Sequence, residues 1–358
     1  MAFKTGAGPA LEPAPRPFTR LGSVLAGLTI VCVLSHSYPL CLAQENTVLV
    51  GSGSTVPLPF YRRLSEEYNK RNSKLQMRYL PVGTSEGINN LSRGAGDFAA
   101  GEAPLTAKEQ TEGNLVEVPI VLIGIVPIYN LPGIKGDLHF SGGLLADIFL
   151  GRVKTWNSPS LAKINSGLAL PDLPIKVVYR PGGKGTNYVF TEFLSKTSPR
   201  FRAEIGATLS PHWPIGEPAE RSSDMAGKVG STPGSIGYVE VQYAVQIRIP
   251  FGSVLNPAGH FVKASKDTIV AACRAVESPG WDKFSVSLTN APGPDSFPIT
   301  SFSWLYLRTT NDVLRTAAVT DLLKWMLTDG QRIAAQEGYS ELPPPLAAEV
   351  KSRLDAWR

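Results

Sequence analysis

The chain has 358 residues, of which 43% are hydrophobic, and a formal net charge of +5. This length and hydrophobic content are sufficient for one large or two medium-sized domains with a buried core. The charge is low for a nucleic-acid-binding protein, and no stripe of Lys and Arg with interleaved aromatic residues occurs. We therefore expect a globular protein that has no nucleic-acid partner.

The first 43 residues have the organisation of a secretory signal peptide. Lys4, Arg16 and Arg20 precede an apolar run over 21–34, and the segment ends in Cys41-Leu42-Ala43, with small residues at the two recognition positions. The apolar run is shorter than the roughly 20 residues that a membrane span needs. We expect residues 1–43 to be cleaved, rather than kept as a membrane anchor, and the mature protein to be periplasmic.

Removal of this segment changes the charge and the cysteine content. Two of the three cysteines are lost, Cys273 remains, and no internal disulfide is possible. The segment carries three basic residues and one Glu, so the net charge of the mature chain is +3. The remaining histidines, His139, His212 and His260, show no metal-ligand spacing. We expect no metal and no cofactor, and a weakly positive surface that favours a small anion.

Beyond residue 43, strand and helix patterns alternate along the chain. The expected elements are, in order, strand 47–50, helix 60–68, strand 75–82, helix 85–91, strand 97–100, a strand-like stretch 115–129 split by Pro127, helix 142–150 capped by Ser141, strand 175–179, a helix from about residue 187, strand 235–240, helix 265–276, strand 300–307 and helix 312–327. Strand–loop–helix units in series predict an α/β fold with parallel sheets covered by helices.

Three of the strand-to-helix turns place Gly, Ser or Thr at the start of a helix. They are Gly53-Ser54-Thr55, Gly83-Thr84-Ser85 and Gly183-Lys184-Gly185-Thr186. Glycine allows a ligand to approach the backbone, and the N–H groups and dipole of a helix start favour an anion. One such turn could be an ordinary helix cap. Three turns on separate strand–helix units that could converge indicate a site for a small oxyanion.

Two charged residues follow expected strands. Arg180 comes directly after strand 175–179, and its planar guanidinium fits two oxygens of an oxyanion, although a surface arginine at a strand end is also possible. Glu102 follows strand 97–100 and is either a helix-start charge or a ligand contact.

Several segments together resemble the periplasmic phosphate-binding proteins of the high-affinity phosphate ABC transporters. The run GSGSTVPLPFY from residue 51 is similar to that family's Gly-Ala-Gly-Ala-Thr-Phe-Pro-Ala-Pro segment. Further similar segments, in order, are 83–85, 103–105, 147–151 with Trp156, 213–216, 234–240 and 297–301. The resemblance covers nearly all of residues 47–343.

The resemblance implies a fold and a function. The fold would be the two-lobed α/β periplasmic-binding-protein (Venus-flytrap) fold with a ligand cleft between the lobes. Lobe 1 would comprise 44–120 and 298–358, lobe 2 would comprise 121–297, and the crossing segments would act as a hinge. The protein would be a monomer that captures inorganic phosphate, catalyses nothing, and delivers the anion to the membrane permease of an ABC importer. A phosphate-sensing or scavenging role would use the same site.

The resemblance also implies a ligand set with contributions from both lobes. Hydroxyl groups, backbone N–H groups and charged side chains would surround the anion. The implied residues are Thr55, Val56, Thr84 and Glu102 from lobe 1, and Arg180, Lys184, Gly185 and Thr186 from lobe 2.

Two of these positions depart from the family, because Glu102 replaces an Asp and Lys184 replaces a Ser. Near neutral pH a phosphate ion carries a proton that a carboxylate accepts, whereas the same carboxylate repels sulfate. Lys184 could bind the anion, neutralise Glu102 or extend into solvent, and neutralisation would weaken this discrimination. We expect phosphate to be preferred, with sulfate or another oxyanion as the alternative.

Two loops resemble enzyme motifs and offer alternative functions. The run Gly83-Thr84-Ser85-Glu86-Gly87 matches the G-x-S-x-G elbow of serine hydrolases, with Ser85 as nucleophile and His260 as a possible base. No His-Gly-Gly oxyanion segment accompanies it. The loop 182–186 fails as a nucleotide-binding P-loop, because Gly185 separates Lys184 from Thr186.

Overall fold

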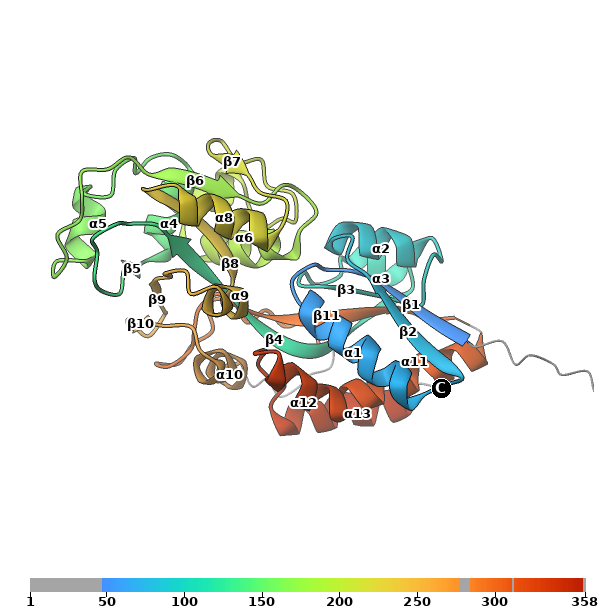
Figure 1. Ribbon diagram of the computed structural model, residues 1–358. Helices are drawn as coiled ribbons and strands as arrows, with labels where there is room; N and C mark the ends of the chain where they lie inside the picture. The colour runs from blue at the N-terminus through green and yellow to red at the C-terminus, as the bar shows by residue number, and fades with distance from the viewer. Residues whose placement is uncertain (1–46, 277–283, 311, 357–358) are drawn as a thin grey trace, which may run out of the picture. The chain divides into compact units, whose positions relative to one another are not determined.

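The computed structural model describes residues 47–276, 284–310 and 312–356 (Figure 1). The expected signal peptide, residues 1–43, lies outside these ranges. Within them, no helix has the length and apolar character that crossing a membrane requires.

Strands and helices alternate over most of the described chain. The strands are β1 (Thr47–Gly53), β2 (Leu75–Leu80), β3 (Phe98–Gly101), β4 (Leu115–Tyr129), β5 (His139–Phe140), β6 (Lys176–Tyr179), β7 (Glu217–Pro218), β8 (Ser235–Glu240), β9 (Ser253–Leu255), β10 (Phe261–Val262) and β11 (Thr300–Arg308). The helices are α1 (Leu58–Arg71), α2 (Thr84–Ser92), α3 (Ala107–Thr111), α4 (Gly142–Phe149), α5 (Pro159–Ile164), α6 (Gly185–Thr197), α7 (Pro199–Glu204), α8 (Ser222–Ser231), α9 (Val241–Gln246), α10 (Lys266–Ala275), α11 (Val313–Met326), α12 (Asp329–Gln336) and α13 (Pro344–Ala356).

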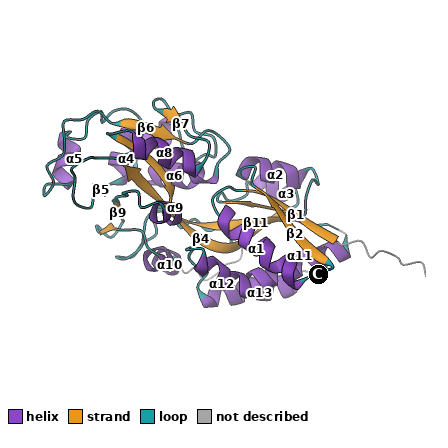
Figure 2. Ribbon diagram, in the orientation of Figure 1, coloured by secondary structure: helices purple, strands orange, loops and turns teal. Residues whose placement is uncertain are grey.

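The long strand β4 is shared by two groups of strands. The main sheet has the order β2-β1-β3-β11-β4-β8-β6-β7. From Leu115 to Gly124, β4 pairs with β11, and from Ile125 to Tyr129 it pairs with β8. Helices α1 and α2 pack on the β1–β3 side and helices α4, α6 and α8 lie on the β6–β8 side, as Figure 2 also shows. The result is a two-lobed α/β fold joined through β4.

The main sheet is mixed, whereas the alternation of strands and helices predicted parallel sheets. The pairs β1–β2, β1–β3, β6–β7 and β6–β8 are parallel as expected. However, β11 runs antiparallel to β3 and β4, and β4 runs antiparallel to β8. The alternation of strands and helices indicates that consecutive strands are joined by helical crossovers, which connect parallel strands. It does not determine the direction of β11, which reaches β3 from far along the chain.

Pro127 does not split β4, which corrects the sequence prediction. The N–H groups of Ile125 and Tyr129 donate to the carbonyls of Ile299 and Pro250, on the side of β4 that faces away from β8. Residue 127 belongs to the same alternating set, so proline removes no donor from the β4–β8 ladder. Its carbonyl still accepts from the N–H of Gly252 at 3.0 Å.

The predicted helix cap at Ser141 is confirmed, and two further expected helices also begin after a polar cap. The side chain of Ser141 accepts from the N–H of Leu144, that of Ser265 from Thr268 and that of Asp312 from Arg315. Each cap satisfies one of the N–H groups that a helix start leaves without an intrahelical partner. Helix α6 begins at Gly185, two residues before the predicted start.

Candidate oxyanion-binding site

Glu102 is a fully buried carboxylate surrounded by hydroxyl groups. Its Oε2 accepts from Ser54 Oγ at 2.7 Å and from Thr84 Oγ1 at 3.4 Å, and its Oε1 accepts from Ser303 Oγ at 3.0 Å. Burial raises the pKa of Glu102 to about 7, although the three hydroxyls act in the opposite direction. The side chain therefore changes its charge near neutral pH.

Arg180, directly after β6, is a buried cation whose side-chain partners are hydroxyl groups. It is 1% exposed. Its Nη1 donates to Ser222 Oγ at 3.1 Å, and its Nη2 lies 3.5 Å from Thr55 Oγ1. Its buried Nε has no hydrogen-bond partner among the described residues. Since buried polar groups normally have a hydrogen-bond partner, the free Nε favours an additional acceptor at this edge of the guanidinium.

The N-terminus of helix α6 lies against Glu102 and Thr84. A Cβ atom added to Gly185 would overlap Glu102 Oε2 and lie 2.9 Å from Thr84 Oγ1. The next residue, Thr186, is fully buried, and its Oγ1 has no partner in the described part of the chain. The first N–H groups of this 13-residue helix have no intrahelical acceptor, and the helix dipole favours a negative charge there.

The structure thus brings together expected site residues that lie far apart in the sequence. Thr55 meets Arg180, and Gly185 meets Glu102 and Thr84. A backbone hydrogen bond of 3.3 Å from Ser85 N to Gly183 O also joins the α2 turn to the loop before α6. The cluster combines donors, namely a cation, a helix start and hydroxyl groups, with one carboxylate acceptor. Such a set fits an oxyanion that carries a proton.

Val56 lies beside this cluster, but its N–H group is already engaged. The N–H donates to Ser54 Oγ at 3.0 Å, and Ser54 Oγ in turn donates to Glu102. An anion would have to share this donor with Ser54. In this structure, Val56 therefore helps to hold Glu102 in place through Ser54.

Lys184 forms an ion pair with Glu220, which was not predicted from the sequence. Its Nζ lies 3.5 Å from Glu220 Oε2, and its side chain is 17% exposed. The hydrogen-bond donors at Glu102 are hydroxyl groups. Of the three roles considered for Lys184, this geometry does not favour neutralisation of Glu102.

We expect Lys184→Ser to have a small effect on anion affinity. The positive charge of Lys184 is already paired with Glu220, whose side chain is 68% exposed, and ion pairs of this kind contribute about 1 kcal/mol or less. The dissociation constant should change by less than about fivefold, as measured by isothermal titration calorimetry. Glu220→Gln serves as the matched control. A loss of affinity in Lys184→Ser that is much larger than this would show that Lys184 contacts the anion directly.

Several supporting residues were not predicted as site residues. They are Ser54, Ser303, Ser222, Glu240, Tyr238 and Asn187, which hold Glu102 or Arg180. A signal was available for three of them. Ser54 belongs to the first Gly/Ser/Thr turn, and Tyr238 and Glu240 belong to the segment 234–240, which carries part of the resemblance. No signal in the sequence distinguished Ser303 from other serines on strands.

The three histidines in the described part of the chain do not form a catalytic arrangement with Ser85. His260 Nδ1 lies 3.1 Å from the carbonyl of Pro294, His139 stacks on Phe261, and His212 is exposed. The backbone of Ser85 contacts Gly183, as described above. The geometry therefore does not favour the hydrolase alternative.

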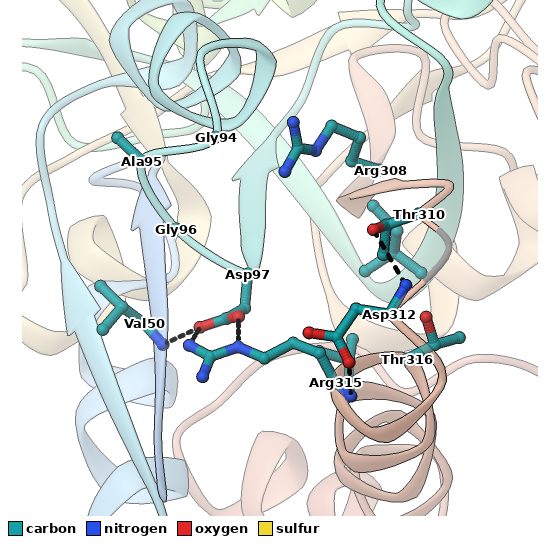
Figure 3. Close-up of a pocket in the computed structure, with 12 residues that line it drawn as sticks. Val50, Gly94, Ala95, Gly96, Asp97, Arg308, Thr310, Asp312, Arg315 and Thr316 are labelled. Carbon is teal, nitrogen blue, oxygen red and sulfur yellow. Dashed lines mark hydrogen bonds and ion pairs between the residues drawn. The ribbon is translucent and has the colours of Figure 1, made fainter.

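A separate cavity of about 580 Å³ lies at the opposite end of β3 (Figure 3). Asp97 is its main buried charge, and both carboxylate oxygens are engaged, by the N–H of Val50 and by the guanidinium of Arg315. Asp97 precedes β3, whereas Glu102 follows it. This cavity is therefore distinct from the oxyanion cluster, and its buried carboxylate already has partners.

Comparison with known proteins agrees with this arrangement. A family model described as a PBP superfamily domain matches residues 42–330. The phosphate-binding protein PstS of Xylella fastidiosa (strain 9a5c) is 33% identical over 320 residues, which are 89% of this chain and 88% of that protein. The PstS of Haemophilus influenzae is 34% identical and covers 88% of this chain and 94% of its own length.

Solved structures show the same fold at lower sequence identity. The periplasmic phosphate-binding protein PfluDING aligns with a TM-score of 0.66 and 19% identity over 86% of this chain and 93% of its own. An ABC-type phosphate transport receptor from Vibrio cholerae aligns with a TM-score of 0.59 and 18% identity over 82% of this chain and 100% of its own.

The two lobes joined by β4 and the matched family model define the class of protein as a periplasmic binding protein. Within that superfamily, the chain belongs to the family of the PstS phosphate-binding proteins.

Proposed function

We propose that the protein is an exported, monomeric solute-binding protein that captures inorganic phosphate between its lobes and delivers it to the permease of an ABC importer. It acts by binding and release in the periplasm and catalyses no reaction. The observation that carries the proposal is the meeting of Arg180 and the α6 start with Glu102, Thr84 and Thr55. The names of the PstS relatives support phosphate as the ligand.

The proposed ligand set contains groups with different roles. Arg180 and the N–H groups of Gly185 and Thr186 would bind the charged oxygens of phosphate, and Thr55 and Thr84 would add hydroxyls. The unpartnered Nε of Arg180 and Oγ1 of Thr186 support this assignment, because buried polar groups normally have a partner. Val56 would contribute a shared N–H group. Lys184 would contribute charge near the site without a direct contact.

The carboxylate of Glu102 would provide the selectivity for phosphate. A carboxylate accepts a hydrogen bond from a protonated phosphate oxygen, whereas sulfate has no proton to donate near neutral pH. The hydroxyls of Ser54 and Ser303 hold this carboxylate in place. Sulfate would therefore bring two negative groups together in a buried site, which costs free energy.

The lobes would close over phosphate by bending of the segments that join them. The proposed lobes are 44–120 with 298–358 for lobe 1 and 121–297 for lobe 2. The change of partner of β4 from β11 to β8, between Gly124 and Ile125, lies near the first of these boundaries and supports a division within β4. A ligand that contacts both lobes stabilises the closed form over the open form. The same closure would remove water and strengthen the charge-assisted hydrogen bonds.

Titration of the mature protein with phosphate and with sulfate at several pH values tests this proposal. We expect phosphate to bind much more tightly than sulfate at pH 8. The ratio of the two affinities should fall as the pH is lowered through the pKa of Glu102, about 7, because a protonated Glu102 donates a hydrogen bond to sulfate. Tighter binding of sulfate than of phosphate at pH 8 would contradict the proposal.

Glu102→Gln should lower this selectivity and remove its dependence on pH. The amide accepts from phosphate through its oxygen and donates to sulfate through its nitrogen, so we expect the ratio of affinities to fall by about tenfold or more. The measurement is the pair of dissociation constants at pH 6 and pH 8. Glu117→Gln is the matched control, because Glu117 is another buried carboxylate, 7% exposed, whose Oε2 accepts from Leu105 N rather than from the site.

A further inference from the structure

We infer that Ser222 and Glu240 form a relay that positions Arg180 and determines which edge of its guanidinium faces the anion. This inference rests on the proposed function, since it assigns two further residues to the same site. Neither residue was part of the predicted ligand set. Each acts through Arg180, and they are therefore positioning residues.

The relay is a continuous chain of hydrogen bonds. Arg180 Nη1 donates to Ser222 Oγ at 3.1 Å, and Ser222 Oγ donates to Glu240 Oε2 at 2.9 Å. Glu240 is 4% exposed, and Arg180 is 1% exposed. The two opposite charges are therefore both buried, and the hydroxyl of Ser222 lies between them.

The direction of this chain follows from the chemistry of its members. A guanidinium only donates hydrogen bonds, and an ionised carboxylate only accepts them. The single hydroxyl proton of Ser222 therefore points to Glu240, and a lone pair of its oxygen faces Arg180. Burial raises the pKa of Glu240, whereas Arg180 and Ser222 favour its ionised form.

The relay leaves one edge of the guanidinium available. Nη1 is committed to Ser222, Nη2 has only the 3.5 Å contact with Thr55, and Nε has no partner among the residues that the structure describes. The Nε and Nη2 groups form a planar fork that fits two oxygens of a tetrahedral anion. Without the relay, rotation of the guanidinium would present other edges.

The backbone of Arg180 is fixed as well. Its N–H donates to the hydroxyl of Tyr238 at 3.1 Å, and that hydroxyl donates to Asn187 Oδ1 at 2.5 Å. The amide nitrogen of Asn187 donates in turn to the carbonyl of Arg180 at 3.2 Å. Both ends of the arginine are therefore held before an anion arrives, which lowers the entropy lost on binding.

Two hypotheses about the role of Glu240 predict opposite effects of its removal on anion affinity. If Glu240 acts only as a negative charge near the site, its removal strengthens binding of an anion. If it positions Arg180 through Ser222, removal of its charge weakens binding, because Ser222 no longer has a fixed orientation. Glu240→Gln distinguishes these views, since glutamine has nearly the same shape without the charge.

The first part of the test measures inorganic phosphate by isothermal titration calorimetry in Ser222→Ala and Ser222→Thr. We expect Ser222→Ala to weaken binding by about tenfold, the effect of one charge-assisted hydrogen bond, and Ser222→Thr to restore most of the loss. Ser223→Ala in the same helix is the control, because Ser223 Oγ contacts Asp224 instead. The melting temperature without ligand separates a loss of positioning from a loss of folding.

The second part combines the two positions. Glu240→Gln should weaken phosphate binding, and the double variant should bind about as well as Ser222→Ala alone, since both residues act through one hydroxyl. Tighter binding in Glu240→Gln, unchanged binding in Ser222→Ala, or fully additive losses would each overturn the relay. If the unmodified protein failed to bind phosphate, the proposed function itself would fail, and the two failures are therefore distinguishable.

Discussion

Arg180→Ala is expected to lower the affinity for phosphate by about 100-fold or more. The substitution removes the guanidinium edge that would form two charge-assisted hydrogen bonds, each contributing roughly 1.5–3 kcal/mol. It also leaves Glu240 buried without the cation that favours its ionised form. Isothermal titration calorimetry measures the loss directly. Unchanged affinity would exclude Arg180 from the site.

Two further variants make the Arg180 result specific. Arg180→Lys retains the positive charge but has no planar fork, so we expect an affinity between those of the unmodified protein and Arg180→Ala. Arg221→Ala is the control for a general effect of charge, because Arg221 is exposed and paired with Asp224 at 3.3 Å. Its phosphate affinity should change by about threefold or less. Equal losses in Arg180→Ala and Arg221→Ala would indicate that only the overall charge matters.

Gly185→Ala is expected to abolish tight phosphate binding while it leaves the fold intact. Its Cβ would overlap Glu102 Oε2 and lie 2.9 Å from Thr84 Oγ1, so the start of α6 could not approach these residues. The anion would then lose contacts from one lobe, and we expect a loss of about 100-fold or more. Gly185 has no positive φ, and alanine is the better helix former, so the melting temperature without ligand should not fall.

The Gly185 prediction has both a control and a compensating variant. Gly143→Ala also places alanine in the first turn of a helix, α4, but its Cβ would meet only the carbonyl of Thr197, at 3.9 Å. It should leave phosphate binding unchanged. Combining Gly185→Ala with Glu102→Asp shortens the opposing side chain by one methylene, and part of the affinity should return. Small-angle scattering with saturating phosphate would show whether the single variant still closes; full closure would contradict the prediction.

The turns that carry the candidate site were visible in the sequence. Gly, Ser and Thr at a strand-to-helix turn indicate a helix start with available N–H groups, and Arg180 stood at the end of an apolar strand. Such features depend on backbone geometry within a few residues. The same local physics explains why the cap at Ser141 was predicted correctly.

The supports of these residues could not be predicted in the same way. Ser303 donates to Glu102 across 201 positions of sequence, because β11 lies next to β3 in the sheet. Lys184 is paired with Glu220, and Arg180 is linked to Glu240 through Ser222. Serine and glutamate occur throughout the chain, so residue type alone did not distinguish these supporting residues from others.

The sequence by itself determined the alternation of strands and helices, the anion-receptive turns and the family resemblance, because each is set by short segments of chain. Only the tertiary structure decided which residues surround Glu102 and Arg180. It also decided that β4 continues without a break at Pro127 and pairs with both β11 and β8. These outcomes depend on the order of strands in the sheet, and that order is set by the packing of segments far apart in sequence, which no local pattern encodes.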